Sequence, residues 1–157
     1  MKKNTGFTLI ELLMVIALLA VLSILGFPMF QGSQKRSRDS RRKTDLQQIT
    51  KALEMYANDT GSYPSSSGGK IVGCTGTLAT SCSWGSAWVR NTTYMQKLPK
   101  DPSSGVSYCY EKASKYYKLY AKIERTDDPD YDEKLSCGGA PYTYVLLSPN
   151  ITPTPKP

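Results

Sequence analysis

The sequence predicts an α+β fold in which one long N-terminal helix packs against a small antiparallel sheet. Residues 7–30 are almost uniformly apolar, and the polar stretch that follows keeps apolar side chains at helical spacing. Later in the chain, short tyrosine-rich segments alternate in the manner of half-buried strands. One helix followed by several short strands indicates a single small domain with a modest core.

The apolar segment, residues 7–30, predicts a helix that crosses a membrane. At 1.5 Å per residue it would be about 36 Å long, whereas the hydrocarbon core of a bilayer is about 30 Å thick. Lys2 and Lys3 precede it, as in a secretory signal, but the segment is longer than such a signal and no small-residue cleavage site follows. We therefore expect the mature protein to retain a membrane-spanning first half of the helix.

One carboxylate, Glu11, interrupts this apolar segment shortly after Gly6. A charge inside a membrane helix is costly and needs a compensating partner. No lysine or arginine lies between Asn4 and Gln34. Cleavage between Gly6 and Phe7 would create a partner, because the new amino group of Phe7 would be a cation on the same helix or on an adjacent copy.

The residues around this acid, Gly-Phe-Thr-Leu-Ile-Glu-Leu-Leu from Gly6 onward, resemble the processing signal of the type IV pilin superfamily. The resemblance is strong over residues 1–64 and weak beyond, where it rests on Leu98–Pro102 and a tyrosine-rich hairpin. It implies that residues 1–6 are a leader, that a prepilin peptidase cuts after Gly6, and that Phe7 is then N-methylated. It also implies that Glu11 neutralises the amino terminus of a neighbouring subunit during assembly.

Gly26 and Pro28 mark the softest part of the expected helix. Pro28 lacks a backbone donor and clashes with the carbonyl of Ile24, while Gly26 adds backbone freedom. The resemblance implies that the helix melts locally here in the filament. The alternative is a simple kink in a membrane helix.

Residues 31–60 continue the helix in amphipathic form. Apolar side chains recur three or four positions apart and form one face that should pack on the sheet: Leu46, Ile49, Leu53 and Tyr56. The helix should end at residues 58–60, with Gly61 in the left-handed conformation that caps a helix.

Basic residues cluster between Lys35 and Lys43 on this half of the helix. We expect Asp39 to pair with Lys43, and Arg41 with Asp45, across one turn of the exposed side. The basic charges fall on all sides of the helix, and neighbouring subunits would cover it in a packed filament. Nucleic acid is therefore not favoured as a direct ligand.

Residues 61–147 form the expected globular domain. Val106–Glu111 and Tyr116–Glu124 predict a hairpin, and Tyr142–Leu147 predicts a third antiparallel strand on the helix. In the second segment, Tyr117, Leu119, Ala121 and Ile123 alternate with Tyr116, Tyr120 and the exposed Lys118 and Lys122.

Other parts of this region carry weaker signals. The Ser/Gly-rich stretch 62–76 predicts a surface loop, and the segment around Trp84 and Trp88 is compatible with a short helix or a strand. The proline-rich tail, residues 148–157, should be extended or disordered.

Four cysteines lie in the globular domain: Cys74, Cys82, Cys109 and Cys137. Their even number indicates disulfides formed in an oxidising compartment, whereas the lack of histidine and of a CxxC pair disfavours zinc. Three pairings are possible. We expect Cys74–Cys82, which closes a short loop, and Cys109–Cys137, which ties the hairpin to the segment entering the third strand.

The acidic segment, residues 126–133, is a weak candidate for calcium. Its carboxylates are Asp127, Asp128, Asp130, Asp132 and Glu133. Oxygen-rich loops suit this ion, and the corresponding region of major secretion pseudopilins often holds it. Because the D-x-D-x-D-G spacing is absent, we favour a solvated loop that balances the basic helix. No other metal or cofactor is expected.

Enzymatic chemistry has little support in this sequence. Without histidine the usual general base is missing, and no serine or cysteine has a recognisable activating partner. The resemblance implies a structural subunit of a type IV pilus, held in the inner or cytoplasmic membrane and then polymerised by the pilus assembly machinery into a homopolymeric filament at the cell surface. The alternatives are the major pseudopilin of a type II secretion system and a minor or DNA-uptake pilin.

Overall fold

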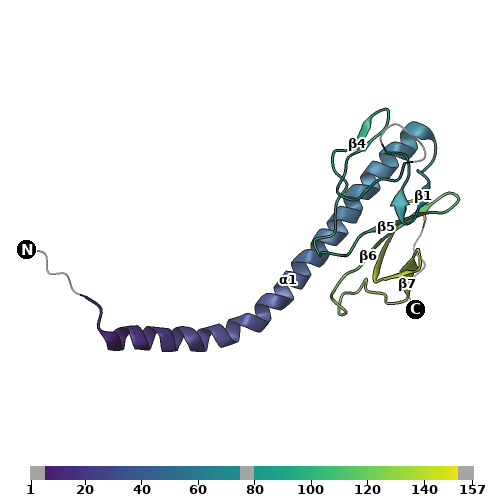
Figure 1. The fold of residues 1–157 in the computed structure, drawn as a ribbon. Helices are drawn as coiled ribbons and strands as arrows, with labels where there is room; N and C mark the ends of the chain where they lie inside the picture. Colours follow the sequence, from purple (N-terminus) through teal and green to yellow (C-terminus); the bar gives the residue numbers. More distant parts are fainter. Residues whose placement is uncertain (1–5, 75–79, 152–157) are drawn as a thin grey trace, which may run out of the picture. The chain divides into compact units, whose positions relative to one another are not determined.

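The computed structural model describes residues 6–74 and 80–151, which form two units, one up to Ser37 and one from Arg38 onward. The helix α1 extends from Leu9 to Thr60. The strands are β1 (Ser66–Ser67), β2 (Lys70–Ile71), β3 (Trp88–Val89), β4 (Thr93–Met95), β5 (Cys109–Lys112), β6 (Tyr117–Ala121), β7 (Leu135–Cys137), β8 (Ala140–Tyr142) and β9 (Tyr144–Leu147) (Figure 1).

The first unit contains the beginning of α1. The helix continues without a break through Gly26 and Pro28, although the side chains of residues 24–29 lie outside the described part. The melting implied for the filament stays a prediction. Residues 1–5 of the expected leader and residues 152–157 of the proline-rich tail also lie outside the described residues.

Within the described part of the chain, no helix offers an apolar stretch long enough to cross a membrane. Because the side chains of residues 24–29 lie outside the described part, the membrane-spanning first half expected over residues 7–30 stays a prediction.

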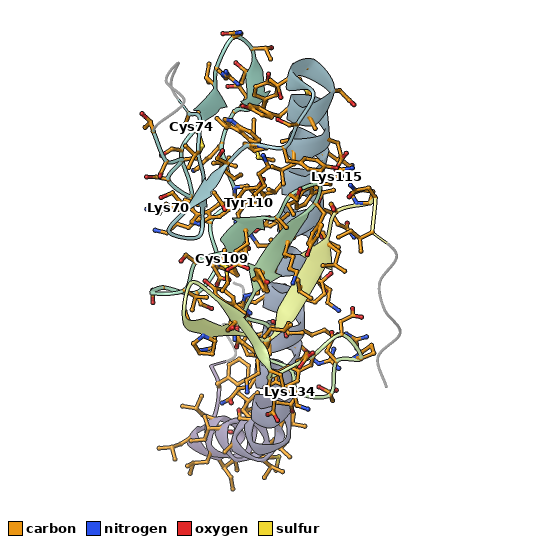
Figure 2. The ribbon with its side chains drawn as sticks, turned by 90° about the vertical axis from the view of Figure 1, so that its right-hand side faces the viewer. Lys70, Cys74, Cys109, Tyr110, Lys115 and Lys134 are labelled. Carbon is orange, nitrogen blue, oxygen red and sulfur yellow. A yellow bond between two sulfur atoms is a disulfide. The ribbon has the colours of Figure 1, made fainter. Side chains whose placement is uncertain are left out.

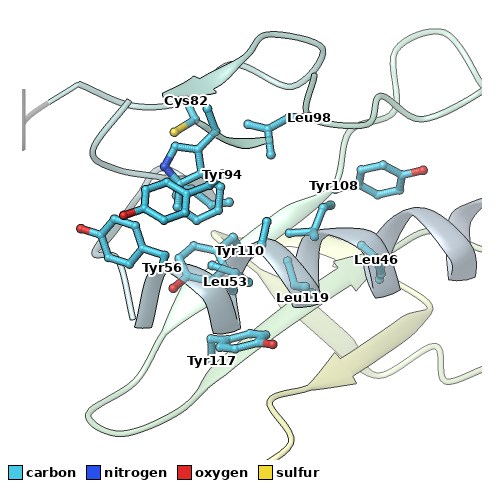
Figure 3. Packing of buried hydrophobic residues seen from close by; sticks show 14 of the residues in the cluster. Leu46, Leu53, Tyr56, Cys82, Tyr94, Leu98, Tyr108, Tyr110, Tyr117 and Leu119 are labelled. Atoms are coloured by element: carbon cyan, nitrogen blue, oxygen red, sulfur yellow. The ribbon is translucent and has the colours of Figure 1, made fainter. Parts of the chain in front are cut away.

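In the second unit, the later part of α1 forms the core with the strands beside it (Figure 1). The expected helix face is confirmed, because Leu46, Ile49, Leu53 and Tyr56 are all buried. In Figure 3, Leu46, Leu53 and Tyr56 of α1 face aromatic and aliphatic side chains of the strands and loops, among them Tyr94, Leu98, Tyr108, Tyr110, Tyr117 and Leu119.

The helix ends as the sequence predicts. The last helical residue is Thr60, and Gly61 adopts a left-handed φ of 79°. Its N–H donates to the carbonyl of Ala57 at 2.8 Å, which satisfies one of the carbonyls left open at a helix end.

The main sheet has the order β5-β6-β9 and is antiparallel throughout, as expected. Its strands are shorter than predicted, and β6 stops at Ala121 instead of Glu124. The reason lies in the helix, because the backbone N–H groups of Glu124 and Arg125 donate to the carboxylate of Asp39 instead of to a strand.

Both faces of β6 are covered. Tyr117, Leu119 and Ala121 face the helix, whereas Tyr120 lies in a second cluster on the other face, with Cys109, Cys137 and Tyr142. The hairpin β7–β8 supplies this cover. The sequence did not predict this hairpin.

The stretch predicted as a surface loop contains a second unpredicted hairpin, β1–β2. Gly68 and Gly69 form its turn with φ values of 54° and 73°, the conformation that two-residue hairpin turns require. The hairpin buries Ile71 in the core. The Gly-Gly pair was the signal that could have identified it. The open question around Trp88 is also settled, since this residue begins β3 and is buried.

Two disulfides cross-link the second unit. Cys74 pairs with Cys82 over a Cα–Cα distance of 5.3 Å, and Cys109 pairs with Cys137 over 6.3 Å. This is the pairing that the sequence favours. The second bond joins β5 of the main sheet to β7 of the covering hairpin.

Candidate functional site

The start of α1 exposes apolar side chains on all sides. Phe7 is 89% exposed, and the large apolar residues after it are also exposed: Leu9, Ile10, Leu12, Leu13, Met14, Val15, Ile16, Leu18, Leu19, Val21 and Leu22. Helices that are apolar all round are normally buried, and contiguous apolar surfaces of this kind mark interaction sites. This segment therefore requires a membrane, or other protein chains, to cover it.

Glu11 caps the helix on which it lies. The N–H and the hydroxyl of Thr8 donate to Oε2 of Glu11, at 2.9 and 2.7 Å. In return, the N–H of Glu11 donates to the hydroxyl of Thr8 at 3.3 Å. Thr8 is the residue before the first helical turn and Glu11 lies three residues later, which is the capping-box arrangement.

The capping box changes the interpretation of this acid. From the sequence we considered only cations as partners for Glu11. Thr8 and Glu11 also form a Thr-x-x-Glu pattern, which predicts a capping box and could have identified Thr8 as a partner. Among the described residues, the hydrogen bonds to Glu11 all reach Oε2. The other oxygen, Oε1, remains able to accept a donor from another chain.

The peptide bond between Gly6 and Phe7 lies just outside the helix. Both residues are exposed and precede Leu9, where α1 begins. A Cβ atom placed on Gly6 would have no neighbour within 4 Å. Exposed, non-helical backbone is the kind of segment that proteases cleave.

A buried arginine of α1 binds acidic side chains both of the helix and of later segments in the second unit. Arg42 is 1% exposed, and its guanidinium binds the carboxylates of Asp39 at 2.7 Å, Asp101 at 2.8 Å and Glu124 at 2.8 Å. Burial by itself would lower the pKa of Arg42. The hydrogen bonds to the three carboxylates have the larger combined effect, so the pKa of Arg42 is raised. Arg38 also binds Glu124. The hydrogen bond from Arg38 has the largest effect on Glu124 and, together with that from Arg42, lowers its pKa to about 2.

These contacts correct two expectations about the helix. Asp39 and Asp45 are buried, so neither forms the exposed pair with Lys43 or Arg41 that the spacing predicts. Asp45 instead accepts a hydrogen bond from the hydroxyl of Tyr108 at 2.7 Å. The basic residues between Lys35 and Lys43 are likewise not all exposed, because Arg42 belongs to the core of the unit.

Lys43 holds the acidic segment. Its ammonium lies 2.7 Å from Asp128, 2.7 Å from Asp130 and 5.2 Å from the ring centre of Tyr144. Burial lowers the pKa of Lys43, but the two carboxylates outweigh it and raise the pKa.

The four calcium candidates therefore do not converge on one point. Asp128 and Asp130 bind Lys43, Asp127 binds Arg125, and Asp132 accepts the N–H of Lys134. Within residues 6–74 and 80–151, no three acidic, histidine or cysteine side chains are grouped as metal ligands.

Comparison with known families gives two matches that together cover most of the chain. Residues 1–27 match the prokaryotic N-terminal methylation motif. Residues 29–123 match the family described as type II secretion system (T2SS), protein G. The first match confirms the resemblance found around Gly6 and Glu11.

Similar individual proteins are of two kinds. The type II secretion system core protein G of Vibrio cholerae is 31% identical over 102 residues, which cover 65% of this chain and 67% of that protein. The type IV wide pilus major component PilA4 of Thermus thermophilus is 42% identical over 65 residues, 41% of this chain and 50% of that protein. The type IV major pilin protein PilA of Myxococcus xanthus is 36% identical over 61 residues, 39% and 28% of the two chains. No solved structure matches the chain.

Proposed function

This chain belongs to the type II secretion system protein G family, and we propose that, like its type IV pilin relatives, it polymerises through α1 into the shaft of a type IV pilus. It is a protein of the pilin and pseudopilin kind, whose relatives are structural subunits of filaments or secretion systems.

The observation that carries the proposal is the exposed apolar start of α1. From Phe7 to Leu22 its large side chains have no cover within the described chain. Bundling this segment with the same segment of other copies would remove that surface from water and would drive assembly. Before assembly the membrane would serve as the covering phase.

Processing at Gly6 would prepare this segment for assembly. We propose that prepilin peptidase cuts the exposed peptide bond after Gly6 and that Phe7 is N-methylated. The free oxygen of Glu11 would then bind the amino terminus of a neighbouring subunit, while its other oxygen keeps the helix capped by Thr8. The proposed role of the chain includes no catalysis.

The runner-up function is a major pseudopilin of a type II secretion system, and the family match over residues 29–123 favours it. We place the surface pilus first because two disulfides cross-link a small domain that would face the outside.

One experiment tests the processing and the filament together. Sheared surface filaments are purified from cells with and without the gene, imaged by electron microscopy, and their subunit is analysed by mass spectrometry. We expect filaments only with the gene and a subunit that begins at a methylated Phe7. A subunit that begins at Met1 would overturn the processing. Normal surface filaments without the gene, together with a defect in protein secretion, would favour the pseudopilin.

A further inference from the structure

A polar hollow lies at the C-terminal end of α1, within the second unit. Its volume is about 280 Å³. The end of α1, the segment that follows it and Val72 line the hollow, together with two cationic side chains, Arg90 and Lys112. Hydroxyl groups of Tyr56 and Thr60 line it as well. The hollow is therefore suited to an anionic group.

Arg90 and Lys112 form no ion pair with an acid in the part of the chain that the structure describes. Among the described residues, no carboxylate lies within 4.0 Å of Arg90 or Lys112. Arg90 is held in position by Tyr56, since its guanidinium lies 5.6 Å from the ring centre and donates to the hydroxyl. A fixed guanidinium with free N–H donors binds carboxylates well.

The nearby acids are already engaged by tyrosines. Glu54 accepts the hydroxyls of Tyr63 and Tyr117, at 3.0 and 3.2 Å. Asp59 acts on Tyr94, because burial first and then Asp59 raise the pKa of the Tyr94 hydroxyl. Neither acid neutralises Arg90 or Lys112, so the hollow keeps its positive charge.

The matching negative charge lies at the other end of the same unit. Residues 125–134 contain five carboxylates and two cations. The side chains of Asp127 and Asp130 are 71% and 56% exposed despite their contacts with Arg125 and Lys43. Along α1 the rise from Lys43, which holds this segment, to Thr60, which lines the hollow, is about 26 Å. Figure 2 shows Lys134 of the acidic segment far below Lys115 and Lys70.

We propose that the hollow around Arg90 and Lys112 binds Asp127 and Asp130 of a second copy of this chain. The two surfaces are different and lie at opposite ends of one unit, so the contact is head-to-tail and can repeat without closing. Such contacts generate open filaments. The inference rests on the proposed function and deepens it, because it names a contact between the globular domains of two adjacent subunits in the filament.

The first test is a zero-length cross-link in full-length filaments. A carbodiimide joins an amine to a carboxylate with no spacer, so the two groups must come into direct contact. In filaments assembled from a mixture of isotope-labelled and unlabelled chains, we expect Lys112 to be linked to Asp127 or Asp130 of another copy. The link should be absent from the protein dispersed in detergent. A link from Lys112 to a different protein, or to another acid, overturns the inference.

The second test is a charge exchange. Arg90→Glu with Lys112→Glu should lower filament yield about tenfold or more, as should Asp127→Lys with Asp130→Lys, since each places like charges at the contact. Combining all four changes should restore the yield to within about threefold of wild type, because the pairs are re-formed with opposite sign. Lys97→Glu, on an exposed lysine away from the hollow, is the matched control.

The outcomes separate the two proposals. If the wild-type chain forms no filaments, the proposed function fails. If it forms filaments and the reversed variants assemble equally well, only the contact is wrong. Melting temperatures of all variants in detergent identify any loss of yield that comes from unfolding, and a combined variant that is folded but not restored overturns the contact.

Discussion

The ammonium of Lys43 donates a hydrogen bond of 2.7 Å to the carboxylate of Asp128, 85 residues further along the chain. Asp130 receives a second hydrogen bond from the same nitrogen. The acidic segment is thus attached to α1 by a cation that belongs to the chain itself. The ammonium of Lys43 therefore balances part of the charge of these two carboxylates.

This relationship predicts that the fold does not depend on calcium. The melting temperature of the wild-type protein should not change when calcium or a chelator is added. Lys43→Met should lower it by a few degrees, since a half-exposed pair of this kind contributes about 1 kcal/mol or less. Lys51→Met, on an exposed lysine of the same helix, is the control. A loss of stability on chelation of the wild type would show that a metal ion is bound after all.

Replacing the buried Arg42 should have a larger effect. Arg42→Met leaves the buried carboxylates of Asp39 and Asp101 without their cation, and such unpaired buried charges cost about 3–5 kcal/mol. Arg38→Met, which removes a partly exposed partner of Glu124, should cost much less. Urea unfolding of both variants measures the difference. Equal losses would contradict the view that burial determines the cost.

The domain should lose stability in acid because of Glu124. Its contacts with Arg38 and Arg42 lower the folded-state pKa to about 2, from an ordinary value of 4.5. In that interval the unfolded chain binds a proton that the folded chain does not. The stabilisation is therefore complete above pH 4.5 and is lost as the pH falls towards about 2. As the pH is lowered over this interval, the urea midpoint of Glu124→Gln should fall less steeply than that of the wild type. Equal slopes for the two proteins would show that Glu124 does not cause the loss of stability in acid.

The two disulfides should contribute unequally. Cys109–Cys137 closes a loop with a sequence separation of 28, and Cys74–Cys82 closes one of 8. Chain-entropy arguments give about 3.6 kcal/mol for the longer loop and about 2.5 kcal/mol for the shorter one. The double serine variant of Cys109 and Cys137 should therefore melt lower and resist protease less. The reverse order would show that local packing outweighs loop length.

Capping and charge at Glu11 can be separated by substitution. Glu11→Gln can still close the capping box with Thr8 but removes the charge, whereas Thr8→Ala removes the hydroxyl from the capping box and keeps the charge. If the charge binds a neighbouring amino terminus, filament yield should collapse in Glu11→Gln and fall only modestly in Thr8→Ala. Membrane fractions provide the control for expression and insertion. Normal filaments from Glu11→Gln would show that the cap alone explains this acid.

Much of the fold could be predicted from the sequence because it depends on local periodicity. The face containing Leu46 and Leu53 follows from spacings of three and four, and Gly61 ends the helix through its own backbone freedom. Alternation along Tyr117–Ala121 likewise predicts β6. The Gly6–Glu11 pattern carries the family resemblance in the same local way.

Only the tertiary structure decided which charged groups are buried and what they bind. The spacing of Asp39 and Lys43 is equally compatible with an exposed helix pair, yet Asp39 accepts the N–H groups of Glu124 and Arg125, and Lys43 binds Asp128. Alternation places Tyr120 on the opposite face of β6 from Leu119, but only the structure shows that the hairpin β7–β8 covers it. These partners lie far away in the sequence, and their geometry is set by packing between elements, which a local pattern of residues does not encode.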